Sequence, residues 1–529
     1  MKLKSLPIKN IIIDIICLLY IVLFVYAATS KILDFENFKV QLGQSPLLTA
    51  FADYVAIGVP AIEYVITLML IIPKFRFYGL LAAFSLMLMF STYIVIILNS
   101  GQFIPCSCGG ILEKMGWTEH LIFNIGFVLL ALIALILHRK FLIENLETNS
   151  YQYHPNKNIN LLGKKRFIIS TSITFITSII IVFLLYFFSE QEIHRNNGFT
   201  RRMPHHPANA IKAVDIKFNS YYIAGFEKGR IYLGNVTAPL RVLSIDKTLN
   251  DVKEITLKIN DVKKYHFSSI QVRVEGPYFY MSDGRVPVVL RGKIGEWVAK
   301  PFSKNDKNFF THLEPMDTIN FALRGINVAE GNIIGKLSIS KKNDTIKLVK
   351  GLLRKRGDGL FDTDGMLSYN KELEKLVYVY YYRNEYVTIN RDFSGIYRGN
   401  TIDTLKEVKL KIADVKSRGE RKFANNPTKI QEYSTTYGKY LFVKSDRLGK
   451  YEREIMLKDA GIIDVYDLQK HTYEFSFYLY NYENEKIKSF KVHGNLLFGL
   501  TDKKYLVCYK LADKYFDFKT PEKATKSNK

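Results

Sequence analysis

Two cysteines separated by a single residue are the part of this chain best suited to chemistry. Cys106 and Cys108 are two of only four cysteines in 529 residues, and they lie in the run Pro-Cys-Ser-Cys-Gly-Gly. The Cα atoms of a disulfide lie about 4.4–6.8 Å apart, so a bridge here requires a tight turn at Ser107. Closing so short a loop stabilises a fold by only about 1.5 kcal/mol, and such bridges tend to be labile or catalytic. The pair therefore favours redox chemistry over a structural bridge or two idle or metal-binding thiols. Because few further ligands lie nearby, we predict no metal.

Five apolar segments around this pair are long enough to cross a membrane. They cover residues 10–29, 51–72, 77–98, 119–138 and 167–188. Lysine and arginine gather before the first segment, between the second and third, and between the fourth and fifth. Such basic connections stay on the cytoplasmic side, so the cysteine loop and the chain after 188 face the outer, oxidising side. The sequence predicts a multi-pass plasma (inner) membrane protein with a cytoplasmic N-terminus and a periplasmic, extracytoplasmic C-terminal domain.

Three polar residues of the predicted spans are candidates to assist the cysteines. Glu63 lies inside the second span, where a carboxylate is costly and commonly marks a proton or ligand path, although it could also snorkel to the outer surface. His120 and Asn124 share one face of the fourth span, directly after the cysteine loop. His120 would hold a thiol proton or favour a thiolate, or serve as an interfacial histidine. Asn124 suits an interhelical hydrogen bond better than it suits a quinone ligand. Cys106, Cys108 and His120 are thus the candidate catalytic residues, and Glu63 and Asn124 the candidate cofactor-binding residues.

Residues 10–140 resemble the MauE/DoxX group of redox-associated, four-helix membrane proteins, which are relatives in architecture of the vitamin K epoxide reductase type. The matching pieces are Ser30–Asp34, Val59–Glu63, Cys106–Gly110 and Trp117–His120 with Asn124. MauE-type proteins are associated with methylamine utilisation, where they are implicated in forming disulfides in the small subunit of methylamine dehydrogenase. The resemblance implies a redox-active helical unit that works on a partner's cysteines. The chain departs from the family at Gly109, where a bulky residue is usual, and in its long C-terminal extension.

Residues 211–512 predict an all-β domain. Tyr473, Phe475, Phe477 and Leu479 alternate with more polar residues, which is the period of a half-buried strand. Strand-rich units recur at 211–258, 265–302, 308–350, 360–412, 427–471 and 473–511. This period indicates a β-propeller of about six blades, loosely resembling TolB-like or NHL-like propellers. Five or seven blades, or a pair of β-sandwiches, are the alternatives.

The expected fold class is multi-domain: a transmembrane α-helical bundle of four helices plus a fifth tethering helix, followed by an all-β propeller-like domain. The expected segments are a redox domain (1–140), a basic cytoplasmic connection (141–166), the fifth transmembrane helix (167–188), a linker (189–210), the propeller (211–512) and a disordered tail (513–529). His205 and His206 are expected to be solvated within the linker. Cys17 and Cys508 are expected to be buried packing residues.

The net charge of +24 comes partly from the cytoplasmic connections and partly from single lysines spread over the outer domain. Nucleic acid is excluded as a partner across a membrane, whereas membrane lipid or an acidic protein fits this charge. The sequence favours a membrane thiol–disulfide redox protein that oxidises or reduces cysteines of an extracytoplasmic partner selected by the propeller, with a membrane quinone as electron carrier. The alternatives are a non-enzymatic, membrane-anchored propeller that binds a ligand or protein, and a DoxX-like subunit of a respiratory complex.

Overall fold

The computed structural model describes residues 8–45, 48, 51–100, 116–149, 164–188, 196–260, 267, 269–303, 309–327, 331–340 and 342–518. The chain divides into two compact units. The first comprises Met1–Glu192 and Leu410–Pro427, and the second comprises Ile193–Lys409 and Thr428–Lys529.

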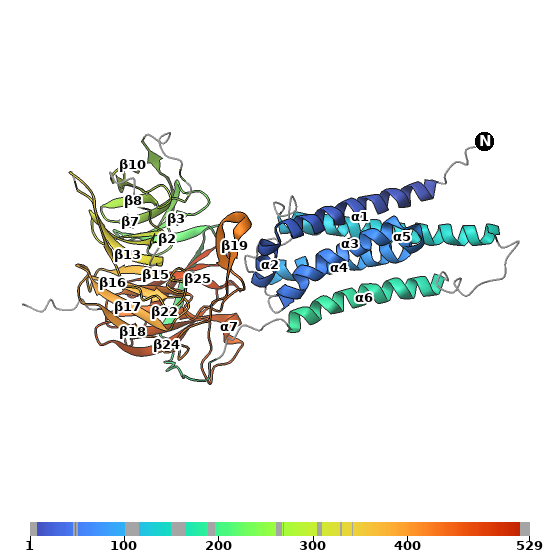
Figure 1. Ribbon diagram of the computed structural model, residues 1–529. Coiled ribbons are helices and arrows are strands. Elements are labelled where there is room, and N and C mark those ends of the chain that lie inside the picture. Colours follow the sequence, from blue (N-terminus) through green and yellow to red (C-terminus); the bar gives the residue numbers. More distant parts are fainter. Residues whose placement is uncertain are drawn as a thin grey trace, which may run out of the picture. The chain divides into compact units, whose positions relative to one another are not determined.

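Five long helices build the first unit, drawn from blue to teal in Figure 1. They are α1 (Ile8–Leu33), α3 (Ala52–Ile71), α4 (Arg76–Ser100), α5 (Trp117–Asn149) and α6 (Lys164–Phe188), with a 3-10 helix η2 (Pro73–Phe75) between α3 and α4. Each contains an apolar stretch long enough to cross a membrane. The predicted fold class, with five apolar helices before an all-β domain, is therefore confirmed.

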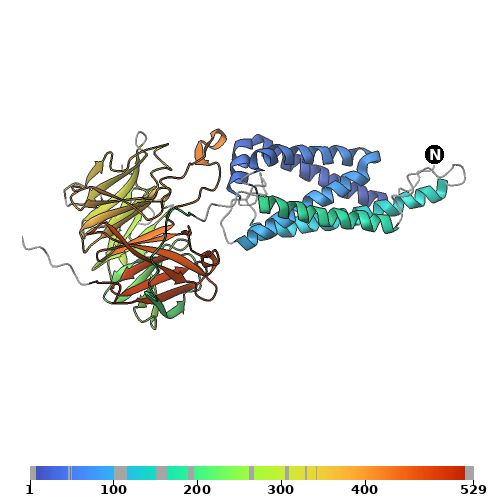
Figure 2. The same cartoon turned by 90° about the horizontal axis from the view of Figure 1, so that it is seen from below.

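Aliphatic, aromatic and small side chains together form the core of this helical unit. Tyr20 and Phe24 of α1 are buried in one cluster with residues of α3, α4 and α5, and the Tyr20 hydroxyl donates a hydrogen bond of 2.6 Å to the carbonyl oxygen of Phe127. Cys17 is buried in the same cluster, as expected. Val22 and Ile122 are instead 60% and 67% exposed. Large apolar side chains on the outside are what a lipid-facing surface requires, and Figure 2 shows the long helices lying side by side.

A short helix, α2 (Phe35–Gln44), occupies part of the loop expected between the first two spans. Phe35, Phe38 and Leu42 follow the three-to-four spacing of an amphipathic helix, and Phe38 and Leu42 are buried. Ten residues are too few to cross a membrane, so α2 packs against the first residues of α3 instead. Its buried cluster also contains Ile97 of α4 and Val182 of α6, with Trp117 of α5 packed against it. We call this end of the helical unit the α2 end.

The second unit contains six blades, each built on four antiparallel strands, with a fifth, short strand added to the second blade, so the expected six-bladed propeller is confirmed. The first three blades are β2 (Tyr221–Glu227) to β5 (Val252–Thr256), β7 (Gln271–Glu275) to β10 (Val298–Pro301) and β11 (His312–Pro315) to β14 (Thr345–Val349). The next two are β15 (Gly365–Asn370) to β18 (Tyr397–Asn400) and β21 (Tyr433–Tyr437) to β24 (Thr472–Tyr480). The last blade combines β25 (Ile487–His493), β26 (Leu496–Thr501) and β27 (Tyr505–Leu511) with β1 (Ala208–Asp215).

The remaining strands complete these blades. They are β3 (Arg230–Asn235), β4 (Arg241–Asp246), β8 (Tyr278–Asp283), β9 (Val288–Lys293), β12 (Asn320–Asn327), β13 (Gly331–Ser338), β16 (Lys375–Tyr380), β17 (Glu385–Asn390), β22 (Tyr440–Ser445) and β23 (Ala460–Asp467). A short strand β6 (Lys258–Ile259) extends the second blade, and a one-turn helix α7 (Met456–Asp459) precedes β23.

Strand β1 closes the propeller by pairing with β27, with Ala213 opposite Val507. This pairing removes two free sheet edges at once. It also shifts the expected blade boundaries, because β1 opens the predicted unit 211–258 but belongs to the last blade. Likewise β24 opens the predicted unit 473–511 but completes the fifth blade.

Much of the expected linker is part of the propeller unit. The Arg201 side chain is fully buried, and its guanidinium pairs with Asp464 at 2.6 Å and with Glu452 at 2.9 Å. The backbone carbonyl of Arg202 accepts a hydrogen bond from Ser476. His205 and His206 are exposed. In the expected tail, Phe516 is buried against Tyr440 and Phe442, while residues 519–529 lie outside the described residues.

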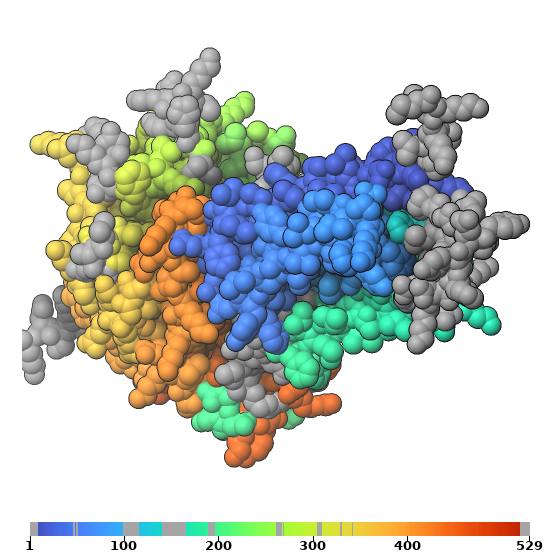
Figure 3. Space-filling model, turned by 45° about the vertical axis from the view of Figure 1, so that its right-hand side comes forward, coloured from blue at the N-terminus to red at the C-terminus, as the bar shows by residue number. Residues whose placement is uncertain are grey.

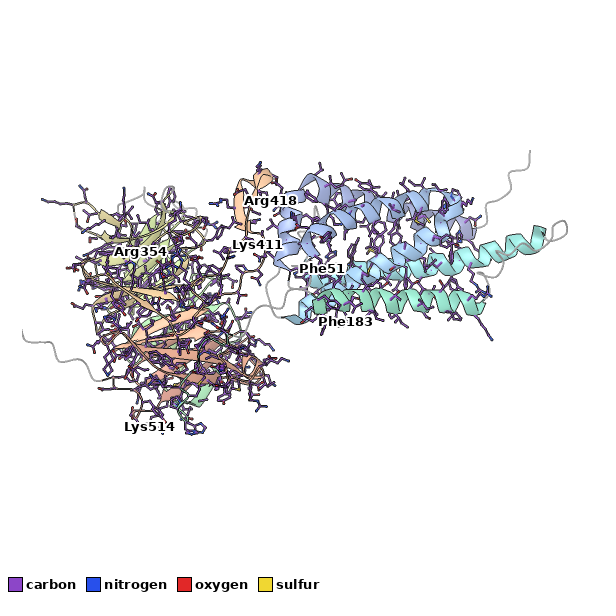
Figure 4. All side chains as sticks on the ribbon, turned by 60° about the horizontal axis from the view of Figure 1, so that its bottom comes forward. Phe51, Phe183, Arg354, Lys411, Arg418 and Lys514 are labelled. Carbon is purple, nitrogen blue, oxygen red and sulfur yellow. The ribbon has the colours of Figure 1, made fainter. Side chains whose placement is uncertain are left out.

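One hairpin was expected to belong to the propeller. It belongs to the helical unit instead. It consists of β19 (Ile412–Val415) and β20 (Glu420–Phe423), joined by a 3-10 helix η6 (Lys416–Arg418). Gly419 closes the turn with a φ of 63°, a left-handed conformation that favours glycine. In Figure 3 the orange hairpin lies against the blue helical unit, and Figure 4 labels Lys411 and Arg418 on it.

Candidate functional site

Cys106 and Cys108 lie outside the described residues, but the helices that hold their loop are described. α4 ends at Ser100 and α5 begins at Trp117. Ile97 and Trp117 both belong to the cluster at the α2 end. The last turn of α4 and the first turn of α5, which flank the segment with the two cysteines, therefore both lie at the α2 end.

A buried ion pair lies inside the helical unit. Lys31, in the last turn of α1, donates a hydrogen bond of 2.6 Å from its Nζ to Oε1 of Glu63 on α3. Their side chains are only 6% and 1% exposed. Two charges removed from water require each other, because either one alone would be strongly destabilising there. Glu63 is thus a paired, buried group and does not snorkel to a surface.

Two aromatic rings lie near the ammonium group of Lys31. Lys31 Nζ lies 5.9 Å and 5.8 Å from the ring centroids of Phe38 and Phe90, within the range of cation–π attraction. The second carboxylate oxygen of Glu63, Oε2, is buried and has no hydrogen-bond partner among the described residues. Lys31 was not among the candidate residues predicted from the sequence. The signal was present, since Lys31 belongs to the Ser30–Asp34 piece of the family resemblance.

His120 and Asn124 are both buried on the first turns of α5, at 3% and 2% exposure. The His120 ring stacks on Trp117, with centroids 6.4 Å apart and planes inclined by 25°. Trp117 in turn faces Tyr93, whose hydroxyl donates to Ser45 Oγ at 3.0 Å. The amide nitrogen Nδ2 of Asn124 has no hydrogen-bond partner in the described part of the chain. An unpaired buried donor is destabilising, so this amide nitrogen is a group that could donate to a ligand.

One cavity of about 180 Å³ brings all four residues together. Lys31, Glu63, His120 and Asn124 contribute its polar wall, and the rest is apolar, with Phe24, Met87, Phe90 and Phe123 among the lining residues. Only the tertiary fold produces this arrangement, because Lys31 and Asn124 are far apart in sequence and come from different helices.

This cavity has the size and chemistry for one aromatic ring with polar substituents. A dry cavity of about 150 Å³ in another protein admits benzene. Asn124 Nδ2 is a donor suited to a carbonyl oxygen, while Glu63 Oε2 is an acceptor suited to a hydroxyl. A quinone head group carries a carbonyl oxygen when oxidised and a hydroxyl when reduced, so the residues present fit such a group.

The propeller holds a second group of buried charges, on the inner strands of its blades. Glu314 of β11 lies 3.3 Å from Arg273 of β7 and 3.8 Å from Lys491 of β25, with His312 at 3.5 Å. Burial raises the pKa of Glu314, but Lys491, His312 and Arg273 outweigh that effect and hold it well below its usual range. These contacts join three blades.

The fold and the site together define a membrane protein in which a helical unit with a largely apolar cavity precedes a six-bladed β-propeller. Residues 9–137 match the family described as methylamine utilisation protein MauE, which confirms the resemblance stated for residues 10–140. The matched segment contains all five candidate residues and Lys31. No curated protein sequence matches the chain.

Two solved structures similar to this chain come from bacteria. Virginiamycin B lyase from Staphylococcus aureus has 10% sequence identity and a TM-score of 0.35, with 57% of this chain and 99% of that chain covered. A member of the DUF4221 family from Bacteroides vulgatus has 11% identity and a TM-score of 0.40, with 58% and 99% covered.

Proposed function

We propose that this protein is a membrane thiol–disulfide redox protein whose Cys106 and Cys108 exchange with cysteines of an extracytoplasmic partner. One observation carries the proposal. The helix ends that flank the segment with the two cysteines lie at the α2 end, and residues of α2 and of the first turns of α5 contribute to the wall of the cavity lined by Lys31, Glu63, His120 and Asn124.

The exchange reaction conserves thiols and electrons. A partner thiolate attacks one sulfur of the Cys106–Cys108 disulfide, which breaks the S–S bond and forms a mixed disulfide. The partner's second thiolate then attacks the mixed disulfide. The partner leaves oxidised by two electrons, and Cys106 and Cys108 are left as a dithiol. Reduction of a partner follows the same steps in reverse.

His120 would manage protons in this reaction. It lies on the first turn of α5, twelve positions after Cys108 in the sequence. An imidazole near a reacting thiol stabilises the thiolate and holds its proton. The helix N-terminus favours the same negative charge.

A membrane quinone is the electron carrier that the cavity would accept. Asn124 would donate a hydrogen bond to it, and the Lys31–Glu63 pair would supply an acceptor and a fixed charge. When bound, a quinone takes up two electrons together with two protons. The aromatic wall of the cavity would keep bulk water from the head group.

The distribution of charge supports an outward-facing α2 end. Arg76 pairs with Asp14 at 2.6 Å, and Arg139 lies over the Phe167 ring, all at the opposite end of the helices from α2. Basic residues stay in the cytoplasm. The α2 end, the cysteine loop and the propeller would then be extracytoplasmic.

The propeller would select the partner. Propellers commonly serve as recognition platforms, and here this is an argument from the fold alone. The lysine-rich composition favours an acidic protein or lipid surface. The family description names methylamine utilisation, so a subunit of a methylamine-oxidising enzyme is one partner that this proposal covers.

The test is to trap the partner in membranes. The single variants Cys106→Ser and Cys108→Ser each retain one thiol, and we expect at least one of them to accumulate a mixed disulfide that reducing agent releases. The double variant should insert normally and trap nothing. If the wild type and the double variant support the same partner oxidation in cells, the protein is an anchored binding module and the proposal fails.

A further inference from the structure

The β19–β20 hairpin is bound to the corner between α1 and α2 by a set of polar contacts. Ser417 Oγ donates to Asp34 Oδ1 at 2.7 Å, and Arg418 donates to Asp34 Oδ2 from Nε at 3.0 Å and Nη2 at 2.7 Å. The backbone nitrogen of Lys416 donates to Glu36 Oε2 at 2.9 Å. These contacts fix the tip of the hairpin on the residues that follow the first membrane span.

The other side of the hairpin lies directly on α2. Gln44 Nε2 donates to the carbonyl oxygen of Phe423 at 2.9 Å. At Gly43 the approach is so close that an added Cβ would lie 1.9 Å from the carbonyl oxygen of Ala424. Only glycine admits the hairpin at this distance, because any side chain would collide with backbone.

Asp34 is held in its charged form by this arrangement. Partial burial raises the pKa of Asp34, but the hydrogen bonds from Ser417 and Arg418 outweigh that effect and lower it. The contact of Asp34 with the hairpin is therefore a charge-assisted one.

Beneath the hairpin tip is a pocket of about 470 Å³ whose wall mixes apolar side chains, among them Tyr26, Leu33 and Phe38, with polar ones. We call it the polar pocket, after the hydroxyl and amide groups in its wall. Thr29, Ser30, Asn37 and Gln41 line it with hydroxyl and amide groups, and Ser417 and Arg418 form part of its wall. The pocket is far larger than one water needs, which is about 10–15 Å³, and it offers the two to four polar partners that a water requires.

Lys31 connects this pocket with the apolar cavity. It lines both of them, and its ammonium group holds Glu63 at 2.6 Å. The order from the hairpin inward is thus polar pocket, Lys31, Glu63 and apolar cavity.

We propose that the polar pocket is a water-filled entrance through which protons reach the buried Lys31–Glu63 pair, with the docked hairpin forming its rim. The need for protons rests on the proposed function. Thiols of the partner and of the reduced Cys106–Cys108 pair release two protons to the aqueous side as they become a disulfide, whereas a quinone that gains the two electrons must gain two protons. Water in the pocket would supply those protons, and Glu63 Oε2, which has no partner among the described residues, would accept and pass them on.

The test measures water access rather than activity. In a variant with all four cysteines replaced by serine, Ser30→Cys places a thiol in the pocket, and Val22→Cys places one on the same helix at a lipid-facing position that is 60% exposed. A charged, membrane-impermeant thiosulfonate should label position 30 from the outer medium. Position 22 should react at least about tenfold more slowly, because the reagent attacks a thiolate, which apolar surroundings disfavour.

A third variant tests whether the entrance reaches the ion pair. Lys31→Cys combined with Glu63→Gln leaves no unpaired buried charge, and its thiol lies where the pocket meets the cavity. We expect a small cationic thiosulfonate to label it from the outer side, more slowly than Ser30→Cys and faster than Val22→Cys. Labelling at position 30 without labelling at position 31 would refute the route to Glu63. No labelling at either position in inserted protein would show that lipid or packing fills the pocket, which also refutes it.

The role of the hairpin is tested by undocking it. Gly43→Ala should push the hairpin away from α2, and Arg418→Gln removes its contacts with Asp34. Each should change the labelling rate at position 31 by at least about threefold, since thiol reactivity follows access. Arg421→Gln is the matched control, because Arg421 pairs with Asp414 inside the hairpin. Equal labelling rates at position 31 in Gly43→Ala, Arg418→Gln and Arg421→Gln would refute the proposal that the hairpin forms the rim of the pocket. Since no native cysteine is present, these outcomes do not depend on whether the protein is a redox enzyme.

Discussion

Lys31 Nζ lies 2.6 Å from Glu63 Oε1 in a part of the helical unit where neither side chain is more than 6% exposed. The pair joins the last turn of α1 to the middle of α3, beside Pro60. Proline lacks a backbone N–H and breaks one turn of helical hydrogen bonding. The ion pair therefore secures α3 to α1 where α3 is weakened, and it places a charged group at the wall of the cavity.

Removing one member of this pair should be far worse than removing both charges. We expect Lys31→Met to lower the free energy of unfolding by about 3–5 kcal/mol, because it leaves Glu63 charged, buried and unpaired. The double variant Lys31→Met with Glu63→Gln should recover most of that loss. Denaturant unfolding in detergent micelles measures both. If the effects of the two substitutions on the free energy of unfolding simply add, Lys31 and Glu63 do not interact directly.

If Glu63 also carries protons, the double variant Lys31→Met with Glu63→Gln should fold but should oxidise its partner slowly. Partner oxidation in membranes containing the double variant is the measurement. Full activity in a protein with neither charge would limit the pair to a structural role.

Asn124 should be more important for a ligand than for stability. Its Nδ2 is buried without a partner in the described part of the chain, so Asn124→Leu should leave the unfolding free energy unchanged or raise it by about 1 kcal/mol. The rate at which an added quinone reoxidises the dithiol should fall about tenfold, the equivalent of one lost hydrogen bond of about 1.4 kcal/mol.

The matched control is Thr67→Val, which removes a hydroxyl already bonded to the Glu63 carbonyl oxygen at 2.9 Å. It should reduce stability slightly and leave reoxidation unchanged. A large loss of stability in Asn124→Leu would instead make Asn124 a structural residue.

His120 should control the reactivity of the cysteine pair through its imidazole. We expect His120→Ala to slow alkylation of the reduced pair several-fold near neutral pH and to move the alkylation profile to higher pH, because a nearby imidazolium stabilises a thiolate. His120→Phe keeps a ring that can stack on Trp117 and should be equally slow. Recovery of the wild-type profile by phenylalanine would show that only the stacking matters.

Labelling of the native cysteines should report topology without interference from the propeller. Cys508 is 1% exposed, and burial raises the pKa of its thiol to about 12, so it should not react while the protein is folded. Cys17 is buried in the helical core. An impermeant maleimide should thus label reduced, intact cells or spheroplasts only at Cys106 or Cys108.

The double variant Cys106→Ser with Cys108→Ser should remain unlabelled until it is denatured. Labelling of the wild type only after lysis would place the cysteine loop in the cytoplasm and reverse the proposed orientation.

Local patterns in the sequence were sufficient for much of the fold. Runs of apolar residues predict the membrane helices because crossing a bilayer requires a minimum length of unbroken apolarity. Alternation such as that of Tyr473 to Leu479 predicts strands, and β24 covers these residues. α2 was not predicted. Its amphipathic spacing spans only ten residues, and the segment between the first two spans was expected to be a loop.

The sequence by itself determined which residues were candidates, since a buried carboxylate or a cysteine pair is unusual wherever it occurs. It could not determine that Lys31 pairs with Glu63, nor that β1 closes the last blade. It also could not assign Leu410–Pro427 to the helical unit. Each of these depends on contacts between segments that are distant in the chain, and the tertiary structure decides them because only the packed core brings such segments within hydrogen-bonding distance.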